Sequence, residues 1–343
     1  MAYRLTLAPW LKGYRPGDAA ADGLAALIVT LMLIPQSLAY ALVAGVPAQM
    51  GLYASILPLL AYALFGSSRT LAVGPVAVVS LMTAAAAGQV AGGDSGAYLA
   101  ATVILALLSG VFLVAMGLLR LGWIANLLSH SVISGFITAS GLLIAASQLK
   151  HLLGIPMQGD TLWELGLSAS REAAGVNGAT LLLGAAALLF LLWARGPLKR
   201  LLARTPLPPM LADLLAKAGP VLAVIGTTVA VAAGDLQSQG VAVVGAIPGG
   251  LPALSLPAFD AGVWGQLALP ALLISLIGFV ESVSVAQTLA AKRRQRIDSN
   301  AELIGLGAAN LASGVSGGFP VTGGFSRSVV NFDAGARSPM AGV

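Results

Sequence analysis

Two charged side chains, Glu281 and Arg327, lie in stretches of the sequence that are otherwise apolar. The planar guanidinium of Arg327 suits an oxyanion such as sulfate, bicarbonate or a carboxylate. Glu281 is the only acid that we place inside a strongly apolar span. It either carries a proton together with the substrate or balances Arg327 while the site is empty. Structural alternatives stay open for both residues, namely a snorkelling arginine near a helix end and a fixed ion pair.

Two glycine-containing breaks interrupt the apolar stretches, and each is followed by a short predicted helix. Gly74-Pro75 leads into a half-helix, and Gly323-Gly324 leads into a helical piece that ends near Phe332. A helix N-terminus presents unpaired N–H groups and about half a positive charge, so two such ends facing each other form an anion site. Alternatively, the glycines only permit close helix packing. The residues expected at these two ends are Ala77, Phe325, Ser326 and Arg327.

Gln36 and Tyr40 lie four residues apart and therefore on one face of the first predicted span. They can offer hydrogen bonds to a bound anion, although polar residues in membrane helices often join one helix to another. Gln36 precedes the first glycine break at a spacing similar to that between Glu281 and the second break. This weak internal repeat, with its second copy inverted, is typical of a secondary transporter.

The composition indicates a membrane protein. Of the 343 residues, 57% are hydrophobic and 9% are charged, against about 25% charged in soluble domains. A soluble enzyme, a disordered chain and a nucleic-acid-binding domain are therefore disfavoured. The sequence has no cysteine, two histidines and no nucleotide-binding or hydrolase motif, so we expect no enzymatic activity, no cofactor, no metal site and no nucleic-acid partner.

Uncharged stretches predict about ten membrane spans, several of them short. With the N-terminus in the cytoplasm, most of the 18 basic residues fall on the cytoplasmic side, as the positive-inside rule requires. The basic run Lys292–Arg296 then orients the chain or binds a lipid head group. The predicted spans cover approximately residues 23–44, 48–65, 75–93, 98–119, 129–149, 178–194, 219–233, 267–291, 301–313 and 325–332.

Several ordered motifs resemble the sulfate permease (SulP) family, the bacterial branch of solute carrier family 26. The similarity extends over essentially the whole chain. The motifs, written from their first residue, are Pro35-Gln-Ser-Leu-Ala-Tyr-Ala, Gly45-Val-Pro-Ala-Gln-Met-Gly-Leu-Tyr, Val73-Gly-Pro-Val-Ala-Val-Val-Ser, Gly245-Ala-Ile-Pro-Gly-Gly-Leu-Pro and Gly317-Gly-Phe-Pro-Val-Thr-Gly-Gly-Phe-Ser-Arg-Ser.

The resemblance implies an all-α polytopic membrane fold made of two inverted repeats of seven spans, with helices 3 and 10 broken. It implies a core and a gate domain, elevator-type alternating access and a homodimer surrounded by membrane lipid in the bacterial inner membrane. By motif, Glu281 matches the position that couples transport to a proton or sodium. The positions matched to the anion site are Gln36, Tyr40, Val76, Ala77, Ser326 and Arg327.

Matched to this pattern, residues 1–22 form a cytoplasmic N-terminal segment and residues 23–343 the transmembrane domain. The first repeat covers about 23–234 and a partial second repeat about 265–343. The sequence ends at Val343, before the last four spans and the STAS domain of the pattern, so we expect it to be part of a longer protein.

We therefore expect a secondary active transporter for sulfate or a related oxyanion such as bicarbonate or a dicarboxylate, coupled to protons or sodium. The alternatives are a sodium-independent exchanger, a channel-like conductor of chloride or bicarbonate, and a membrane scaffold that transports nothing.

Overall fold

The computed structural model describes residues 7–11, 13–126, 130–157, 159, 161–198, 201, 219–243, 250, 252, 254 and 256–343. The chain divides into two compact units, which are considered one at a time. Unit 1 comprises Met1–Ile137 and Pro248–Val343, and unit 2 comprises Thr138–Ile247. The predicted motif at Gly245 and the start of the fifth predicted span at Ser129 lie outside the described residues.

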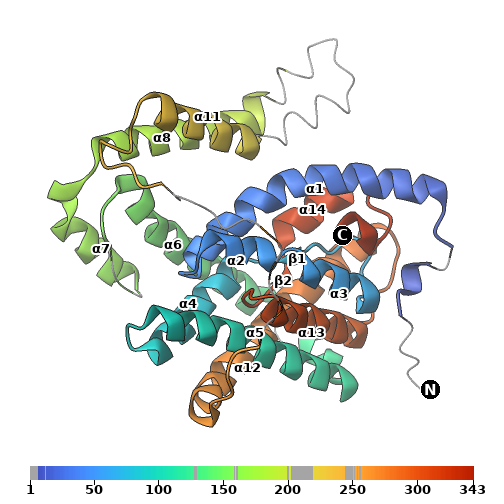
Figure 1. Cartoon of the computed structure of the whole chain (residues 1–343). Coiled ribbons are helices and arrows are strands. Elements are labelled where there is room, and N and C mark those ends of the chain that lie inside the picture. The colour runs from blue at the N-terminus through green and yellow to red at the C-terminus, as the bar shows by residue number, and fades with distance from the viewer. Residues whose placement is uncertain are drawn as a thin grey trace. The chain divides into compact units, whose positions relative to one another are not determined.

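Unit 1 holds most of the long helices (Figure 1). Its two short strands are β1 (Val73–Gly74) and β2 (Thr322–Gly323). Short 3-10 turns cover Pro9–Leu11 (η1), Leu121–Asn126 (η2) and Pro339–Ala341 (η5). Its helices are α1 (Pro16–Val43), α2 (Ala48–Tyr53), α3 (Leu57–Phe65), α4 (Ala77–Ala91), α5 (Ser95–Leu118), α12 (Ala261–Lys292), α13 (Ser299–Val315) and α14 (Phe325–Asp333).

Unit 2 contains most of α6 (His130–Leu153), followed by shorter elements. These are α7 (Leu162–Arg171), η3 (Ala173–Gly175), α8 (Gly178–Trp193), the π-helical turn η4 (Ala194–Leu198) and α11 (Gly219–Ala233). Helix α7 was not among the predicted spans, because it is amphipathic and not uniformly apolar. It begins with a capping box between Thr161 and Glu164, which fixes the first turn.

The helices follow the predicted spans with two main differences. The span predicted over 48–65 is divided into α2 and α3. Helix α1 begins at Pro16, well before the apolar stretch, because a proline at the first helical position and Asp18, which accepts from the backbone N–H of Arg15, start the helix early.

Four helical segments among the described residues are long and apolar enough to cross a membrane. They are Pro16–Val43, Ala48–Phe65, Ser95–Leu118 and Ala261–Lys292, whereas α4 and α14 have only 15 and 9 residues. A membrane span needs about 20 residues, so α4 and α14 are half-helices, as the sequence predicts.

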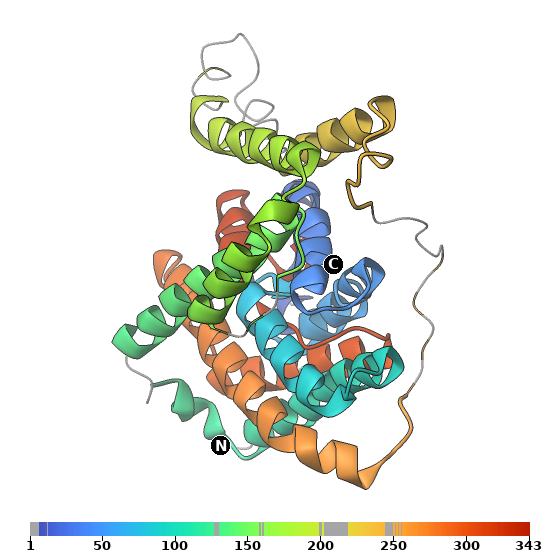
Figure 2. The same ribbon diagram turned by 90° about the vertical axis from the view of Figure 1, so that its left-hand side faces the viewer.

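The backbones of helices α5 and α13 lie so close together that only glycine fits at their contact. A β-carbon added at Gly307 of α13 would lie 2.8 Å from the backbone nitrogen of Val114 and 2.9 Å from the carbonyl oxygen of Gly110, both in α5. Small residues allow such close packing where lipid supplies no hydrophobic drive between helices. Helix α12, orange in Figure 2, packs against α4 and α5.

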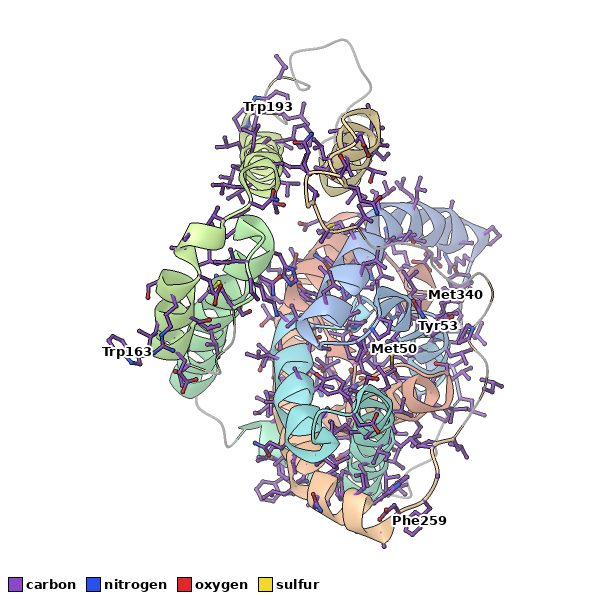
Figure 3. All side chains as sticks on the ribbon, turned by 60° about the vertical axis from the view of Figure 1, so that its left-hand side comes forward. Met50, Tyr53, Trp163, Trp193, Phe259 and Met340 are labelled. Carbon is purple, nitrogen blue, oxygen red and sulfur yellow. The ribbon has the colours of Figure 1, made fainter. Side chains whose placement is uncertain are left out.

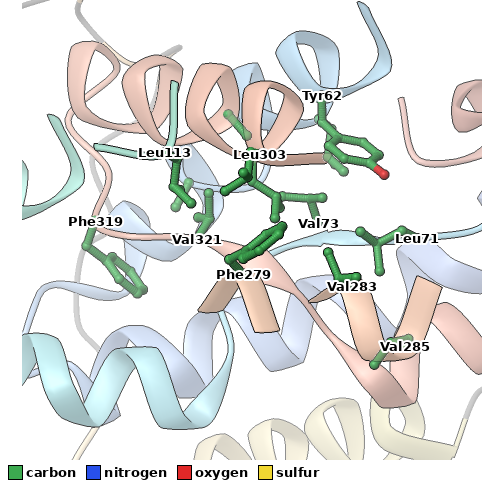
Figure 4. Close-up of a cluster of buried hydrophobic side chains, with 14 of the residues drawn as sticks. Tyr62, Leu71, Val73, Leu113, Phe279, Val283, Val285, Leu303, Phe319 and Val321 are labelled. Atoms are coloured by element: carbon green, nitrogen blue, oxygen red, sulfur yellow. The ribbon is translucent and has the colours of Figure 1, made fainter. Parts of the chain in front are cut away.

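The main apolar core of unit 1 forms where these helices meet (Figure 4). Phe279 of α12, Leu303 of α13 and Phe319, which precedes β2, are 1% exposed or less. Val73 of β1 belongs to the same cluster. The core therefore encloses the short strands that lead into the two half-helices.

Several aromatic side chains project away from the ribbon (Figure 3). In unit 2, Trp163 is 80% exposed and Trp193 is 43% exposed; in unit 1, Phe259 is 77% exposed. Tryptophan is enriched where a membrane surface meets water, so the two tryptophans suit an interfacial position.

Candidate anion-binding site

The two half-helices start from one antiparallel strand pair. Val73 pairs with Gly323 and Gly74 pairs with Thr322. Helix α4 begins three residues after β1, and α14 begins two residues after β2. Because the strands run in opposite directions, the two helices leave the pair in opposite directions with their N-termini close to it (Figure 1). The breaks were predicted from the sequence, but the antiparallel strand pair that joins them was not.

Helix α12 holds β2 in place through buried hydroxyl groups. The Thr322 hydroxyl donates to the carbonyl oxygen of Gly278 at 2.7 Å, and the Ser282 hydroxyl lies 2.5 Å from Thr322 Oγ1. Ser282 Oγ also accepts from the backbone N–H of Gly323 at 2.7 Å. These bonds satisfy strand groups that no water could reach.

Helix α13 holds the residues just before β2. The side-chain amide of Asn310 bonds both backbone groups of Val321, donating at 2.8 Å and accepting at 3.0 Å. The Ser313 hydroxyl donates to the carbonyl oxygen of Phe319 at 2.6 Å. The second break is therefore an ordered segment with its backbone groups paired.

The first turn of α14 is bonded directly to the chain before α4. The backbone N–H of Gly324 donates to the carbonyl oxygen of Ala72 at 3.0 Å, and Ser328 Oγ accepts from the N–H of Ala72 at 2.9 Å. One turn later, the amide of Asn331 donates to the carbonyl oxygen of Thr70 at 3.1 Å. Each half-helix thus fixes the position of the other.

Arg327 lies over this crossing and is 2% exposed. A β-carbon at Gly74 would lie 3.1 Å from Nη1 of Arg327, and one at Gly324 would lie 3.0 Å from its Nη2. Neither Nη1 nor Nη2 has a hydrogen-bond partner among the described residues. A buried guanidinium with two free nitrogens carries a large desolvation cost unless a ligand pairs with it.

Tyr40 of α1 and Glu281 of α12 approach the same guanidinium. Both interact electrostatically with Arg327, and Tyr40 also interacts with Glu281. No hydrogen bond joins Glu281 to either Nη1 or Nη2 of Arg327. The structure therefore brings these three predicted site residues together without closing the fixed ion pair of the structural alternative.

The other predicted residues occupy the helix starts or the neighbouring face of α1. Val76 is the N-cap of α4 and is buried, and Ala77 is its first residue and is half-buried. Phe325 and Ser326 begin α14 with exposed side chains. Gln36 is half-buried one turn before Tyr40 and forms no side-chain hydrogen bond with any residue that the structure describes.

A second buried acid, outside the strongly apolar spans, was not predicted from the sequence. Glu302 of α13 is fully buried, and its carboxylate accepts from the Tyr62 hydroxyl at 2.7 Å. It also accepts from the N–H and hydroxyl of Ser67 and from the N–H of Ser68, at 2.7–2.8 Å. Four donors stabilise this carboxylate in place of a cation.

The remaining buried polar residues of the site were not predicted. Ser282 directly follows Glu281, and Asn310 and Ser313 lie one turn apart on α13. Polar side chains that recur on one face of an apolar helix are a usable signal for internal hydrogen bonding. The described residues contain no group of three or more His, Cys, Asp or Glu side chains that could hold a metal ion.

The fold is that of the class of all-helical membrane transporters. The profile of the sulfate permease family matches residues 20–343. The chain belongs to the sulfate permease family.

Curated relatives agree with this assignment. The chain is 38% identical to "Sulfate transporter 4.1, chloroplastic" of Arabidopsis thaliana, over 97% of this chain and 47% of the relative. It is 37% identical to a probable sulfate transporter of Mycobacterium tuberculosis, over 96% of this chain and 55% of the relative. The chain thus spans about half the length of these relatives.

Two solved structures share the fold. "The overall structure of SLC26A9" superimposes with a TM-score of 0.87 at 26% identity, covering 98% of this chain and 54% of that one. The transmembrane domain of a cyanobacterial bicarbonate transporter, BicA, superimposes with a TM-score of 0.78 at 25% identity, covering 96% and 80%.

Proposed function

We propose that the protein is a secondary active anion transporter whose substrate is sulfate or a related oxyanion. The observation that carries this proposal is the buried guanidinium of Arg327 beside the starts of α4 and α14. Two of its nitrogens have no hydrogen-bond partner in the described part of the chain. A planar donor pair of this kind matches two oxygens of a sulfate, bicarbonate or carboxylate group. The family membership and the names of the sulfate-transporting relatives support it.

The charge of the site favours a dianion. Arg327 contributes one positive charge, and each helix N-terminus contributes about half a charge. The sum is close to the two negative charges of sulfate. An ionised Glu281 would offset one of these charges and leave a site that suits a monoanion such as bicarbonate or chloride.

This balance suggests how a proton is coupled to sulfate. Protonation of Glu281 removes its negative charge from the vicinity of Arg327 and so strengthens dianion binding, and the bound dianion in turn favours the protonated carboxyl. Proton and sulfate then bind and leave together. Glu281 is the proton carrier in this scheme, and Arg327 holds the anion.

Sodium is the alternative coupling ion. A hard cation prefers several oxygen ligands. One turn away from Glu281 on α12 lie Ile277, Gly278 and Val285, which offer no side-chain oxygen, and Ser284, whose hydroxyl is the single side-chain oxygen at these positions and donates to the carbonyl oxygen of Val280. The side chains of α12 therefore favour a proton over sodium.

We further infer that transport uses elevator-type alternating access in a homodimer in the bacterial inner membrane. The bonds that join α12, α13 and α14 to the chain segments around β1 and β2 support a site that moves as one body. A channel-like conductor would need no proton carrier, and a scaffold would need no anion site.

Transport assays in liposomes test the proposal. The reconstituted protein should accumulate labelled sulfate faster when a pH gradient drives protons in the same direction. Arg327→Ala should lose uptake, while Arg294→Ala, which removes an exposed arginine outside the site, should keep it. Equal uptake by both variants would contradict anion binding by Arg327. Uptake that the pH gradient does not affect would contradict proton coupling.

A further inference from the structure

Unit 1 has a pocket of about 320 Å³, and Arg327 is not among the residues that line it. We call it the Trp10 pocket. It lies where the N-terminal turn η1 meets the loop after α3 and the loop after α12. The residues that matter for its chemistry are Trp10, Ser67, Arg69, Gln295 and Arg296.

The pocket is electropositive. Arg69 and Arg296 are both exposed, and neither guanidinium has a hydrogen bond or ion pair with a residue that the structure describes. Two acids that adjoin the lining, Asp298 and Glu302, are already engaged: Asp298 accepts from the N–H groups of Asn300 and Ala301, and Glu302 accepts from four donors. Two arginines converging with Gln295 suit a phosphate group.

The edge of the pocket is apolar. The Trp10 indole N–H donates to the carbonyl oxygen of Ala63 at 2.7 Å, and the N–H of Ala8 donates to the carbonyl oxygen of Leu64 at 2.8 Å. These bonds lay the N-terminal turn along the end of α3. Around it, Leu7 is 65% exposed, Leu11 is 57% exposed and Leu64 is 45% exposed.

Trp10 connects the charged pocket to this apolar edge. Its ring lines the pocket and packs edge-on against Tyr14, with the ring centroids 5.4 Å apart. Tryptophan and tyrosine favour the head-group level of a membrane, where one side of the ring is apolar and the other is wet. Free phosphate would use the arginines but leave the exposed leucines uncovered.

We propose that the Trp10 pocket binds the phosphate of an anionic glycerophospholipid, with the acyl chains lying against Leu7, Leu11 and Leu64. Arg69 and Arg296 hold the phosphate oxygens, and Gln295 donates to the head group. The positive-inside distribution of charge puts this pocket at the cytoplasmic surface, where anionic lipids attract basic residues. The bound lipid then fixes the N-terminal segment on α3.

Native mass spectrometry of the detergent-purified protein tests this binding directly. Short-chain phosphatidylglycerol is titrated against phosphatidylcholine, and inorganic phosphate and glycerol phosphate are added as competitors. The pocket variant is Arg69→Gln with Arg296→Gln. The matched control is Lys292→Gln with Arg294→Gln, which also removes two positive charges but at positions outside the pocket lining. Size-exclusion profiles and thermal unfolding would check that both variants are folded.

We expect the pocket variant to bind phosphatidylglycerol about tenfold more weakly or worse, and the control to change by less than twofold. Trp10→Ala should weaken the binding of phosphatidylglycerol but leave any binding of inorganic phosphate unchanged. Equal losses in the pocket variant and the control would overturn the proposal, since binding would then follow net charge. Inorganic phosphate that competes as strongly as the lipid would also overturn it in favour of a soluble phosphate site. Lipid binding is measured without transport, so its outcome does not depend on the transport assay.

Discussion

The guanidinium of Arg327 rests against the backbone of Gly74, which belongs to the other half of the sequence. A β-carbon at Gly74 would lie 3.1–3.4 Å from three atoms of the guanidinium group. The φ angle of Gly74 is +154°, a conformation that favours glycine. The position of Arg327, the proposed anion-binding residue, therefore depends on the absence of a side chain at Gly74.

Substitution of Gly74 by alanine should displace Arg327 and weaken anion binding. The added β-carbon and the backbone strain together cost about 1–3 kcal/mol, so we expect sulfate affinity to fall by about tenfold or more. Isothermal titration of sulfate into the purified protein measures this. Gly88→Ala in the same half-helix is the control, because a β-carbon there meets nothing within 4 Å. An unchanged affinity in Gly74→Ala would separate this glycine from the site.

Removal of Arg327 should abolish sulfate binding without unfolding the protein. Its terminal nitrogens form no hydrogen bond with the residues that the structure describes. Arg327→Ala therefore loses no such bond and removes a buried unpaired charge. We expect the melting temperature without sulfate to stay equal or rise, and the stabilisation by added sulfate to vanish. Arg327→Lys should retain partial binding, because lysine keeps the charge but loses the fork. A large fall in melting temperature in sulfate-free buffer would show that Arg327 is structural.

Neutralisation of Glu281 should separate anion binding from proton coupling. We expect Glu281→Gln to bind sulfate with an affinity that no longer depends on pH, whereas the unmodified protein binds more tightly as the pH falls. Accumulation driven by a pH gradient should be lost, while exchange of sulfate for sulfate persists. Scintillation proximity binding and liposome exchange measure the two quantities. Glu172→Gln, at the exposed C-cap of α7, is the control. Full gradient-driven uptake by Glu281→Gln would show that another group carries the proton. Sulfate flux that does not respond to the gradient in either protein would favour a channel-like protein.

Glu302 should tolerate glutamine better than alanine. In Glu302→Gln the amide oxygen can still accept from Ser67 and Ser68, and the amide nitrogen can donate to the Tyr62 hydroxyl in place of the present bond. Glu302→Ala leaves these buried donors unpaired, at a cost of about 1–3 kcal/mol for each unsatisfied group. Thermal unfolding in detergent compares the two variants. Equal destabilisation would mean that the negative charge itself is required.

The close contact between α5 and α13 predicts that even one added methyl group lowers the stability of the protein. Gly307→Ala places a methyl group 2.8–2.9 Å from backbone atoms of α5, and overpacking of this kind costs about 1–3 kcal/mol. We expect a lower melting temperature and a broader transition. Gly265→Ala on α12, where a β-carbon meets nothing within 4 Å, should be neutral or slightly stabilising because alanine favours a helix.

The local features of this fold are visible in the sequence. Gly74-Pro75 and Gly323-Gly324 interrupt apolar runs, and the structure starts its half-helices at Ala77 and Phe325. Glycine and proline act through the chain immediately around them, so the breaks could be placed without knowledge of the fold.

The contacts between segments far apart in the sequence could not be predicted in the same way. The pairing of Val73 with Gly323 and the burial of Glu302 under Ser67 depend on contacts between distant segments. Nothing in the spacing around Glu302 distinguishes a carboxylate at a helix start from one buried inside the fold, because its four donors come from elsewhere in the chain. The role of Ser282 could not be predicted either, because its partner Gly323 lies 41 residues away in the sequence.

The strand crossing also has a consequence for biogenesis. β1 precedes β2 by most of the chain, and Ala72 finds its hydrogen-bond partners in Gly324 and Ser328. During synthesis, therefore, the segment before α4 is made long before the residues that satisfy its backbone, and unpaired peptide groups are costly in lipid. We expect this segment to stay outside the hydrocarbon, held by the insertion machinery or by water, until the last residues of the crossing emerge from the ribosome.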